Sequence, residues 1–291
     1  MSSVAIAGNA PDPFWVGIAQ SDDILIPIGT YDEGKWINTW PETSIDEQPE
    51  IDKLIKATNG KAQLQDIPAK WIGPIKTIPA KVYLWSEAPR PRLLKVLNAV
   101  KYGSHCSGGW ALKTDLYPRK EFDYAPTPKV GIATNRDSGV IPFESNITIG
   151  KLPASLRKVI ESSFDGKYPV EFVHIYKASK MIMVGALYFI EAQQKSPYTY
   201  NPKETECYDL KVLNSWLLLK GDKISALSSE FIPTDCWGKE THTIVPNAVI
   251  FVDGKHYVVS ENYGYEWEFY TIHQILNDGL KEVLNVGGGG C

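Results

Sequence analysis

The chain has 291 residues, of which 43% are hydrophobic and 22% are charged, a mixture typical of folded globular proteins. The formal net charge of −4 and the lack of a lysine and arginine cluster argue against nucleic-acid binding. No apolar run approaches the roughly 20 residues that a membrane-spanning helix needs, so we expect no membrane span.

The segment up to residue 40 predicts a β-meander. Residues 14–40, "FWVGIAQSDDILIPIGTYDEGKWINTW", are short apolar strands separated by turn residues, with a good hairpin loop at residues 32–34. Trp36 and Trp40 share one face of the third strand. The preceding residues lack the basic and apolar regions of a signal peptide.

The middle of the chain mixes helical and strand patterns. Apolar residues at helical spacing predict short helices at residues 50–58, 92–101 and 153–164. Residues 130–144 have a strand–turn–strand pattern. The ten-residue apolar run at residues 181–190 predicts a strand that is buried on both faces.

The C-terminal third predicts two hairpins and a helix. Residues 216–227 and 249–261 each contain two apolar runs joined by a Gly-Asp or an Asp-Gly turn. Residues 271–284 open with a threonine and a glutamine in capping-box spacing, which predicts a helix.

These patterns predict a mainly β fold of antiparallel hairpins and meanders with a few short helices. We expect a propeller-like or multi-sheet arrangement, with a two-sheet β-sandwich as the alternative. No shift in composition marks a boundary, so residues 1–291 are expected to form a single β-rich domain. Residues 286–291 are expected to be a flexible or disulfide-tethered tail.

The cysteines bear on the cellular compartment. Two disulfides would indicate a secreted or periplasmic protein whose signal has been removed, whereas four unrelated thiols would fit a cytoplasmic one. The four are Cys106, Cys207, Cys236 and Cys291. No C-x-x-C pair, paired-histidine motif, EF-hand or phosphate-binding glycine motif occurs, so we expect no metal and no cofactor.

A thiol, an imidazole and an amide occur in an order that suggests catalysis. Cys106, His242 and Asn262 resemble the papain-like cysteine peptidases in order and spacing. The resemblance implies a thiol hydrolase in which His242 activates Cys106 and Asn262 orients His242. The sequence departs from that family at Val100, where a glutamine is expected, and Asn247 is the best match to the histidine position.

The N-terminal stretch suggests carbohydrate chemistry. "NAPDPFWV", residues 9–16, is similar to the opening of five-bladed-propeller glycosidases of the arabinanase type. The similarity implies that Asp12 is the general base. Such enzymes also need a protonated carboxyl group, for which Glu191 is the best candidate.

An aromatic row near the C-terminus has two interpretations. In "ENYGYEWEFY", residues 261–270, Tyr263, Tyr265, Trp267 and Phe269 fall on one face of a continuous strand, opposite Glu266 and Glu268. The row is either a core face or, with Trp36 and Trp40, a platform for a glycan or a protein partner.

Because no catalytic set is complete, the leading hypothesis is a non-catalytic, exported protein. It would bind a protein partner or assemble with itself through an aromatic-rich surface. A glycan-active propeller-type hydrolase and a papain-like thiol hydrolase are the alternatives.

Overall fold

A computed structural model gives the fold. It describes residues 13–21, 24–40, 53, 78–86, 90–103, 108–115, 131–145, 147–166, 168–181, 185–194, 211–233, 242–264 and 267–287. Antiparallel strands dominate these residues, which confirms the predicted mainly β, multi-sheet class. None of the described helices is both long and apolar enough to span a bilayer.

Six antiparallel strands close on themselves into a barrel-like sheet, which we call the barrel. The circuit runs β1, β7, β4, β5, β6, β2 and back to β1, and β3 extends it from β2. The strands are β1 (Phe14–Ser21), β2 (Ile24–Asp32), β3 (Lys35–Asn38), β4 (Lys81–Trp85), β5 (Arg92–Gly103), β6 (Gly108–Thr114) and β7 (Gly131–Thr134). The predicted meander at residues 14–40 is confirmed. The predicted helix at 92–101 is wrong, because β5 pairs with β4 and β6.

A second sheet, the middle sheet, has the order β16-β15-β14-β13-β8. Its strands are β8 (Val140–Pro142), β13 (Thr243–Val252), β14 (Lys255–Gly264), β15 (Trp267–Ile275) and β16 (Leu280–Gly287). The predicted hairpin at 249–261 is confirmed. The predicted helix at 271–284 is wrong, because β14 supplies backbone partners to β15, which then turns back into β16. Val286 is only 3% exposed within β16, so the predicted tail does not begin at residue 286.

A third sheet, the outer sheet, has the order β12-β11-β10-β9 and carries a helix. Its elements are η3 (Ile149–Lys151), α3 (Ala154–Ser163), β9 (Val170–Met181), β10 (Gly185–Gln194), β11 (Lys211–Lys220) and β12 (Lys223–Pro233). The hairpin at 216–227 and the helix at 153–164 are confirmed. The run at 181–190 is not one strand, because β9 ends and β10 begins within it, although residues 187–190 are buried on both faces.

The segment at 130–144 is not a hairpin either. Its two strands, β7 and β8, belong to the barrel and to the middle sheet. The predicted helix at 50–58 lies outside the described residues, apart from a single helical position at Lys53.

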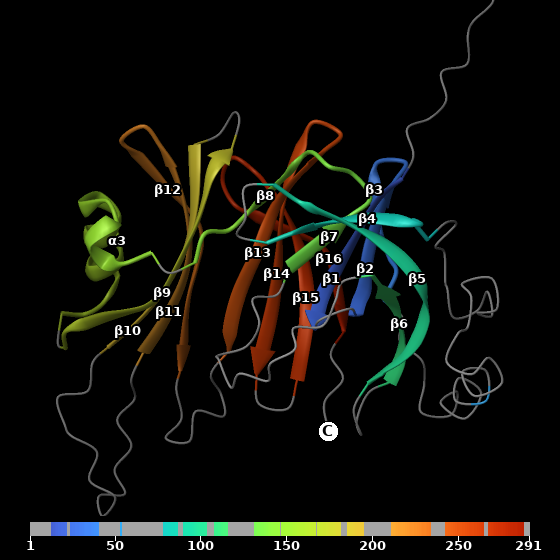
Figure 1. The fold of residues 1–291 in the computed structure, drawn as a ribbon. Helices are drawn as coiled ribbons and strands as arrows, with labels where there is room; N and C mark the ends of the chain where they lie inside the picture. Colours follow the sequence, from blue (N-terminus) through green and yellow to red (C-terminus); the bar gives the residue numbers. More distant parts are fainter. Residues whose placement is uncertain are drawn as a thin grey trace, which may run out of the picture.

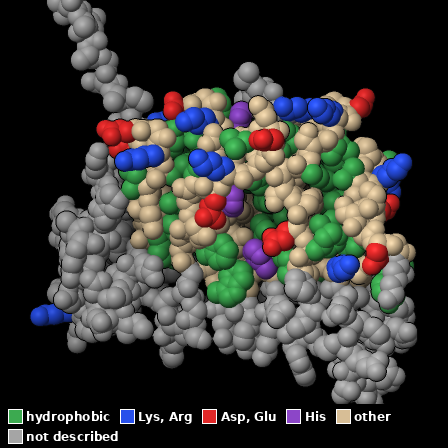
Figure 2. Space-filling view, turned by 180° about the vertical axis from the view of Figure 1, so that it is seen from behind, with side chains coloured by type: hydrophobic (Ala, Val, Ile, Leu, Met, Phe, Trp, Pro, Cys, Tyr) green, Lys and Arg blue, Asp and Glu red, His purple; other side chains and the backbone are tan. Residues whose placement is uncertain are grey.

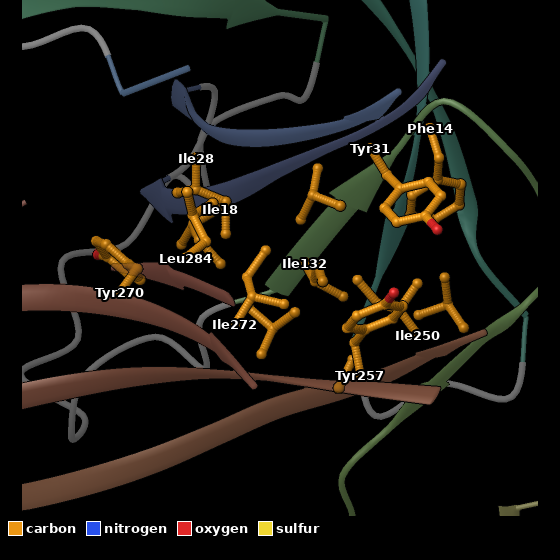
Figure 3. Close-up of a cluster of buried hydrophobic side chains, with 14 of the residues drawn as sticks. Phe14, Ile18, Ile28, Tyr31, Ile132, Ile250, Tyr257, Tyr270, Ile272 and Leu284 are labelled. Atoms are coloured by element: carbon orange, nitrogen blue, oxygen red, sulfur yellow. The ribbon is translucent and has the colours of Figure 1, made fainter. Parts of the chain in front are cut away.

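The elements stack as four layers in the order barrel, middle sheet, outer sheet and α3 (Figure 1). Barrel side chains such as Ile18 and Ile28 pack against Leu284 and Ile272 of the middle sheet (Figure 3). Successive side chains of a strand point to opposite faces, so the middle sheet also packs against the outer sheet, for example through Val258. The outer sheet in turn packs its far face against α3. Hydrophobic burial on both faces is therefore what fixes the two inner layers.

This stack corrects the alternative architecture. The described strands form three sheets rather than two, so a two-sheet sandwich is wrong. One of the three closes on itself, which a propeller blade does not do, so the arrangement is multi-sheet rather than propeller-like.

Candidate functional site

The aromatic row folds back on itself at one end of the middle sheet. β14 ends at Gly264 and β15 begins at Trp267, and these two residues lie directly opposite each other. Tyr263 lies opposite Glu268, so Tyr263 shares a face with Glu268 and not with Trp267. The prediction of one continuous strand with all aromatic rings on one face is therefore wrong. Tyr265 and Glu266 lie outside the described residues.

Three rings form a stack on the face toward the outer sheet. The rings of Trp267 and Phe269 are 5.1 Å apart and nearly parallel, at 24°. The imidazole of His242 lies 5.3 Å from the Trp267 ring in an edge-on arrangement. We call Trp267, Phe269 and His242 the aromatic stack. Trp267 and Phe269 are partly exposed, and none of the three clusters between the layers includes them.

Gly264 makes the position of the indole possible. A Cβ atom added at Gly264 would lie 1.9 Å from Cε2 of Trp267, so the indole lies directly over the glycine backbone. Covering a strand glycine with an aromatic ring from the neighbouring strand is a known way to stabilise a sheet. The glycine, Phe269 and His242 together restrict Trp267 to one place.

Replacing Gly264 by alanine should displace the indole and lower the free energy of unfolding by about 1–2 kcal/mol, because the new methyl group overpacks the contact. Near-UV circular dichroism should lose part of its tryptophan signal, and urea titration gives the change in stability. Gly279→Ala is the control, because its added Cβ meets only the Leu227 carbonyl oxygen, at 3.5 Å. An unchanged near-UV spectrum in Gly264→Ala would contradict this packing.

A polar network supports the stack. His242 Nε2 and Asn262 Oδ1 are 3.2 Å apart, and Asn262, 4% exposed, donates from Nδ2 to Thr271 Oγ1 at 3.1 Å. Ser260 Oγ is 3.0 Å from the same threonine oxygen. Two members of the suggested thiol site are thus neighbours. The third, Cys106, lies outside the described residues, as do Cys207, Cys236 and Cys291, so the thiol hydrolase stays a prediction.

The outer sheet brings further polar groups to this face. Asn214 donates from Nδ2 to the His242 carbonyl oxygen at 3.3 Å, and Glu191 lies directly opposite Asn214 in the pairing of β10 with β11. Burial raises the pKa of Glu191, while His174 on β9 lowers it in part. The pKa of Tyr176 is raised by burial and by the charge of Glu191. Figure 2 shows histidine, acidic and hydrophobic side chains together in the middle of one face, whereas most Lys and Arg side chains lie nearer its edges.

The opposite face of the same hairpin, toward the barrel, carries a pair of carboxyl groups. The Tyr270 hydroxyl lies 3.0 Å from Glu261 Oε1 and also within hydrogen-bonding distance of Glu268 Oε1. Glu261 is 2% exposed, and its Oε2 atom has no hydrogen-bond partner. Burial first, and then the charge of Glu268, raise the pKa of Glu261 to about 7. The pKa of Tyr263 is raised by burial and by Glu261.

Trp36 and Trp40, the other residues of the predicted binding surface, both pack against aromatic side chains. The Trp36 ring lies 5.5 Å from the Tyr31 ring and 5.4 Å from the Tyr257 ring. Trp40 packs against Tyr270 with a ring separation of 5.5 Å. Both tryptophans border the cluster between the barrel and the middle sheet. Asp12 lies outside the described residues, so the suggested general base has no described position.

The sequence patterns missed Asn214, Glu261, Tyr270 and the role of Gly264. A usable signal was present at two of these positions. Asn214 interrupts the apolar strand "KVLNSWLLLK", and Glu261 interrupts the apolar alternation of "KHYVVSENYG". A polar residue inside a buried strand needs a partner and so points to a network or a site.

Within the described part of the chain, no group of three or more His, Cys, Asp or Glu side chains could hold a metal ion. No protein-family model matches the chain, and neither a curated protein nor a solved structure is significantly similar to it.

Proposed function

We propose that the protein is a non-catalytic binding protein that engages its partner through the aromatic stack. The carrying observation is that Trp267 packs against Gly264, Phe269 and His242 while it stays partly exposed. A rigid aromatic ring loses little conformational entropy on binding, which is why tryptophan is favoured in interfaces.

The stack suits a ligand that has a flat apolar surface beside polar groups. A partner protein, or a second copy of the chain, would insert an aromatic or aliphatic side chain next to His242 and Asn262. A glycan is the other candidate, because the carbon-bound hydrogens of a sugar ring pack well on indole. Export with the signal removed belongs to this proposal, and non-reducing mass spectrometry tests it through the disulfides that it predicts.

Replacing Trp267 by alanine should weaken binding at least tenfold, because it removes the largest contact surface of the stack. Ligands are selected from a displayed peptide library and from a glycan array with the wild-type protein. Their affinities are then compared between wild type and Trp267→Ala. Phe251→Ala is the matched control, because Phe251 is 42% exposed and lies 4.9 Å from His256 in a similar ring pair at the other end of β14.

Two results would overturn the proposal. The first is that the selected ligands bind Trp267→Ala as tightly as wild type but lose affinity for Phe251→Ala. The other is a complete lack of ligands in both selections, together with a monomer at all protein concentrations in sedimentation velocity.

The carboxyl pair favours a second candidate, a glycan-active hydrolase. A retaining glycosidase needs two carboxyl groups about 5–5.5 Å apart, one of them protonated at neutral pH. Glu261 and Glu268 both contact the Tyr270 hydroxyl, and the pKa of Glu261 is raised to about 7. Chromogenic glycosides of several sugar types should then be cleaved by wild type but not by Glu268→Gln. If the wild-type protein cleaves none of these glycosides, the hydrolase candidate is wrong.

A further inference from the structure

Two buried hydrogen-bond acceptors belong to directly paired residues on neighbouring strands of the outer sheet. Glu191 Oε2 on β10 and Asn214 Oδ1 on β11 are buried atoms without a hydrogen-bond partner, and the two residues are directly paired. The orientation of the Asn214 amide is fixed, because its Nδ2 donates to the His242 carbonyl oxygen at 3.3 Å. Asn214 is 4% exposed, so its side chain lies inside the protein rather than at the surface.

The acceptors lie between the outer and the middle sheet, next to the aromatic stack. Glu191 is two residues beyond Phe189, and Asn214 two before Trp216; both of these rings pack in the cluster between the two sheets. Strand alternation puts Glu191 and Asn214 on the same face. The hydrogen bond from Asn214 to His242 joins this face to the stack. Glu191 is partly exposed and His174, opposite it on β9, is exposed, so the acceptors are reached from the β9 side.

The missing partner must donate hydrogen bonds and should carry positive charge. Leaving a buried acceptor without a donor destabilises the folded state, and a carboxylate does so more than a neutral group. An ammonium or guanidinium group donates several hydrogen bonds and neutralises a carboxylate. Aromatic faces nearby would add cation–π attraction. The described residues give Glu191 Oε2 no such donor.

We propose that Glu191 and Asn214 bind a protonated amine or guanidinium group of the ligand whose apolar part contacts Trp267. This inference rests on the proposed function of the aromatic stack and adds the chemical class of the ligand. A basic side chain beside an apolar one in a partner protein fits both parts, whereas a neutral glycan fits only the stack.

The test compares two probes of similar shape, 2-phenylethylammonium and neutral 2-phenylethanol, with binding followed by NMR titration at pH 8. Wild type should bind the ammonium probe roughly tenfold more tightly than the alcohol, as one charge-assisted hydrogen bond predicts. Glu191→Gln should remove that preference and leave the alcohol unaffected. Glu161→Gln, at an exposed position on α3, should change neither affinity.

Equal affinities for the two probes, or a preference that survives in Glu191→Gln, would overturn the cation site and leave the aromatic stack intact as a binding surface. If neither probe binds, the cation site is also overturned. The aromatic stack is tested separately, by the peptide and glycan selections.

A second measurement does not depend on a variant that must fold. In wild-type protein with ¹³C-labelled glutamate carboxyl groups, the ammonium probe should lower the pKa of Glu191 toward its ordinary value, because the bound cation stabilises the carboxylate. The resonance is assigned from its absence in Glu191→Gln. No change in the titration of that resonance at saturating probe would contradict the proposal.

Discussion

Replacing Gly185 by alanine should lower the free energy of unfolding by about 3–5 kcal/mol, as the sum of backbone strain and overpacking. Gly185 opens β10 with φ of 108°, where an alanine is strained. An added Cβ would also lie 2.1 Å from the Leu219 carbonyl oxygen on β11, and backbone cannot move aside as a side chain can. The change is a large part of the total stability expected for a folded protein. Urea denaturation followed by circular dichroism measures it.

Gly221→Ala is the matched control for this substitution. Gly221 also has a positive φ, 57°, in the neighbouring β11–β12 hairpin, but no atom lies within 4 Å of an added Cβ. Its cost should be only about 1–2 kcal/mol, from the left-handed conformation alone. Equal losses in the two variants would show that the contact with Leu219 does not matter.

The second large effect is a fall in stability as the pH rises through neutrality, caused by the carboxyl pair. Tyr270 has one hydroxyl proton, yet its oxygen contacts both Glu261 and Glu268. One of the two carboxyl groups must therefore be protonated and donate to that oxygen, for both contacts to be hydrogen bonds. Among the described residues, Tyr263 also faces Glu261, and its raised pKa keeps it neutral at this pH.

The sign follows from the pKa values. The pKa of Glu261 rises from 4.5 to about 7 on folding, so the folded state binds the proton more tightly than the unfolded state. The stabilisation is complete below pH 4.5 and is lost as the pH rises to about 7. Because one pKa unit corresponds to 1.36 kcal/mol, the loss is on the order of 3 kcal/mol.

Urea denaturation at several pH values between 4 and 8 measures this loss. Glu261→Gln should flatten the profile, because its amide keeps the shape of the neutral acid without a titrating proton. Glu161→Gln, exposed on α3, should keep the wild-type slope. A wild-type slope in Glu261→Gln would show that another group is responsible.

Local turn chemistry made the hairpins predictable, but it did not reveal which strands pair over long distances. The Asp253–Gly254 turn joins β13 and β14 as expected. Residues 92–101 instead looked helical, since Leu93, Leu94 and Leu97 fit a helical spacing; in β5, Leu94 is buried while Leu93 and Leu97 are both half exposed. Pairing with β4 and β6 overrides that spacing, and no local pattern encodes those partners.

The site shows the same division between local and long-range information. His242, Asn262, Glu191 and Trp267 were recognisable as unusual residues in the sequence. Glu191 reaches this site through the pairing of the outer sheet, and the face of Trp267 depends on a reversal between Gly264 and Trp267 that puts Tyr263 and Trp267 on opposite faces. A one-residue difference in that reversal exchanges the faces of every later side chain, so the carboxyl pair could not be foreseen.

The order of the layers along the chain has a consequence for how much each layer depends on the others. β8 and β13 are paired neighbours in the middle sheet, yet α3 and the whole outer sheet lie between them in the sequence. Between β8 and β13 the chain therefore makes one long excursion, and in the described residues the backbone pairings of the barrel and the middle sheet do not involve α3 or the outer sheet, apart from the bridge of Glu144 with Lys177. A chain without this excursion would keep every other described pairing but would expose Val249 and Val258 to water. The outer sheet therefore protects one face of the middle sheet, and the boundary between the two sheets is where Glu191, Asn214 and His242 meet.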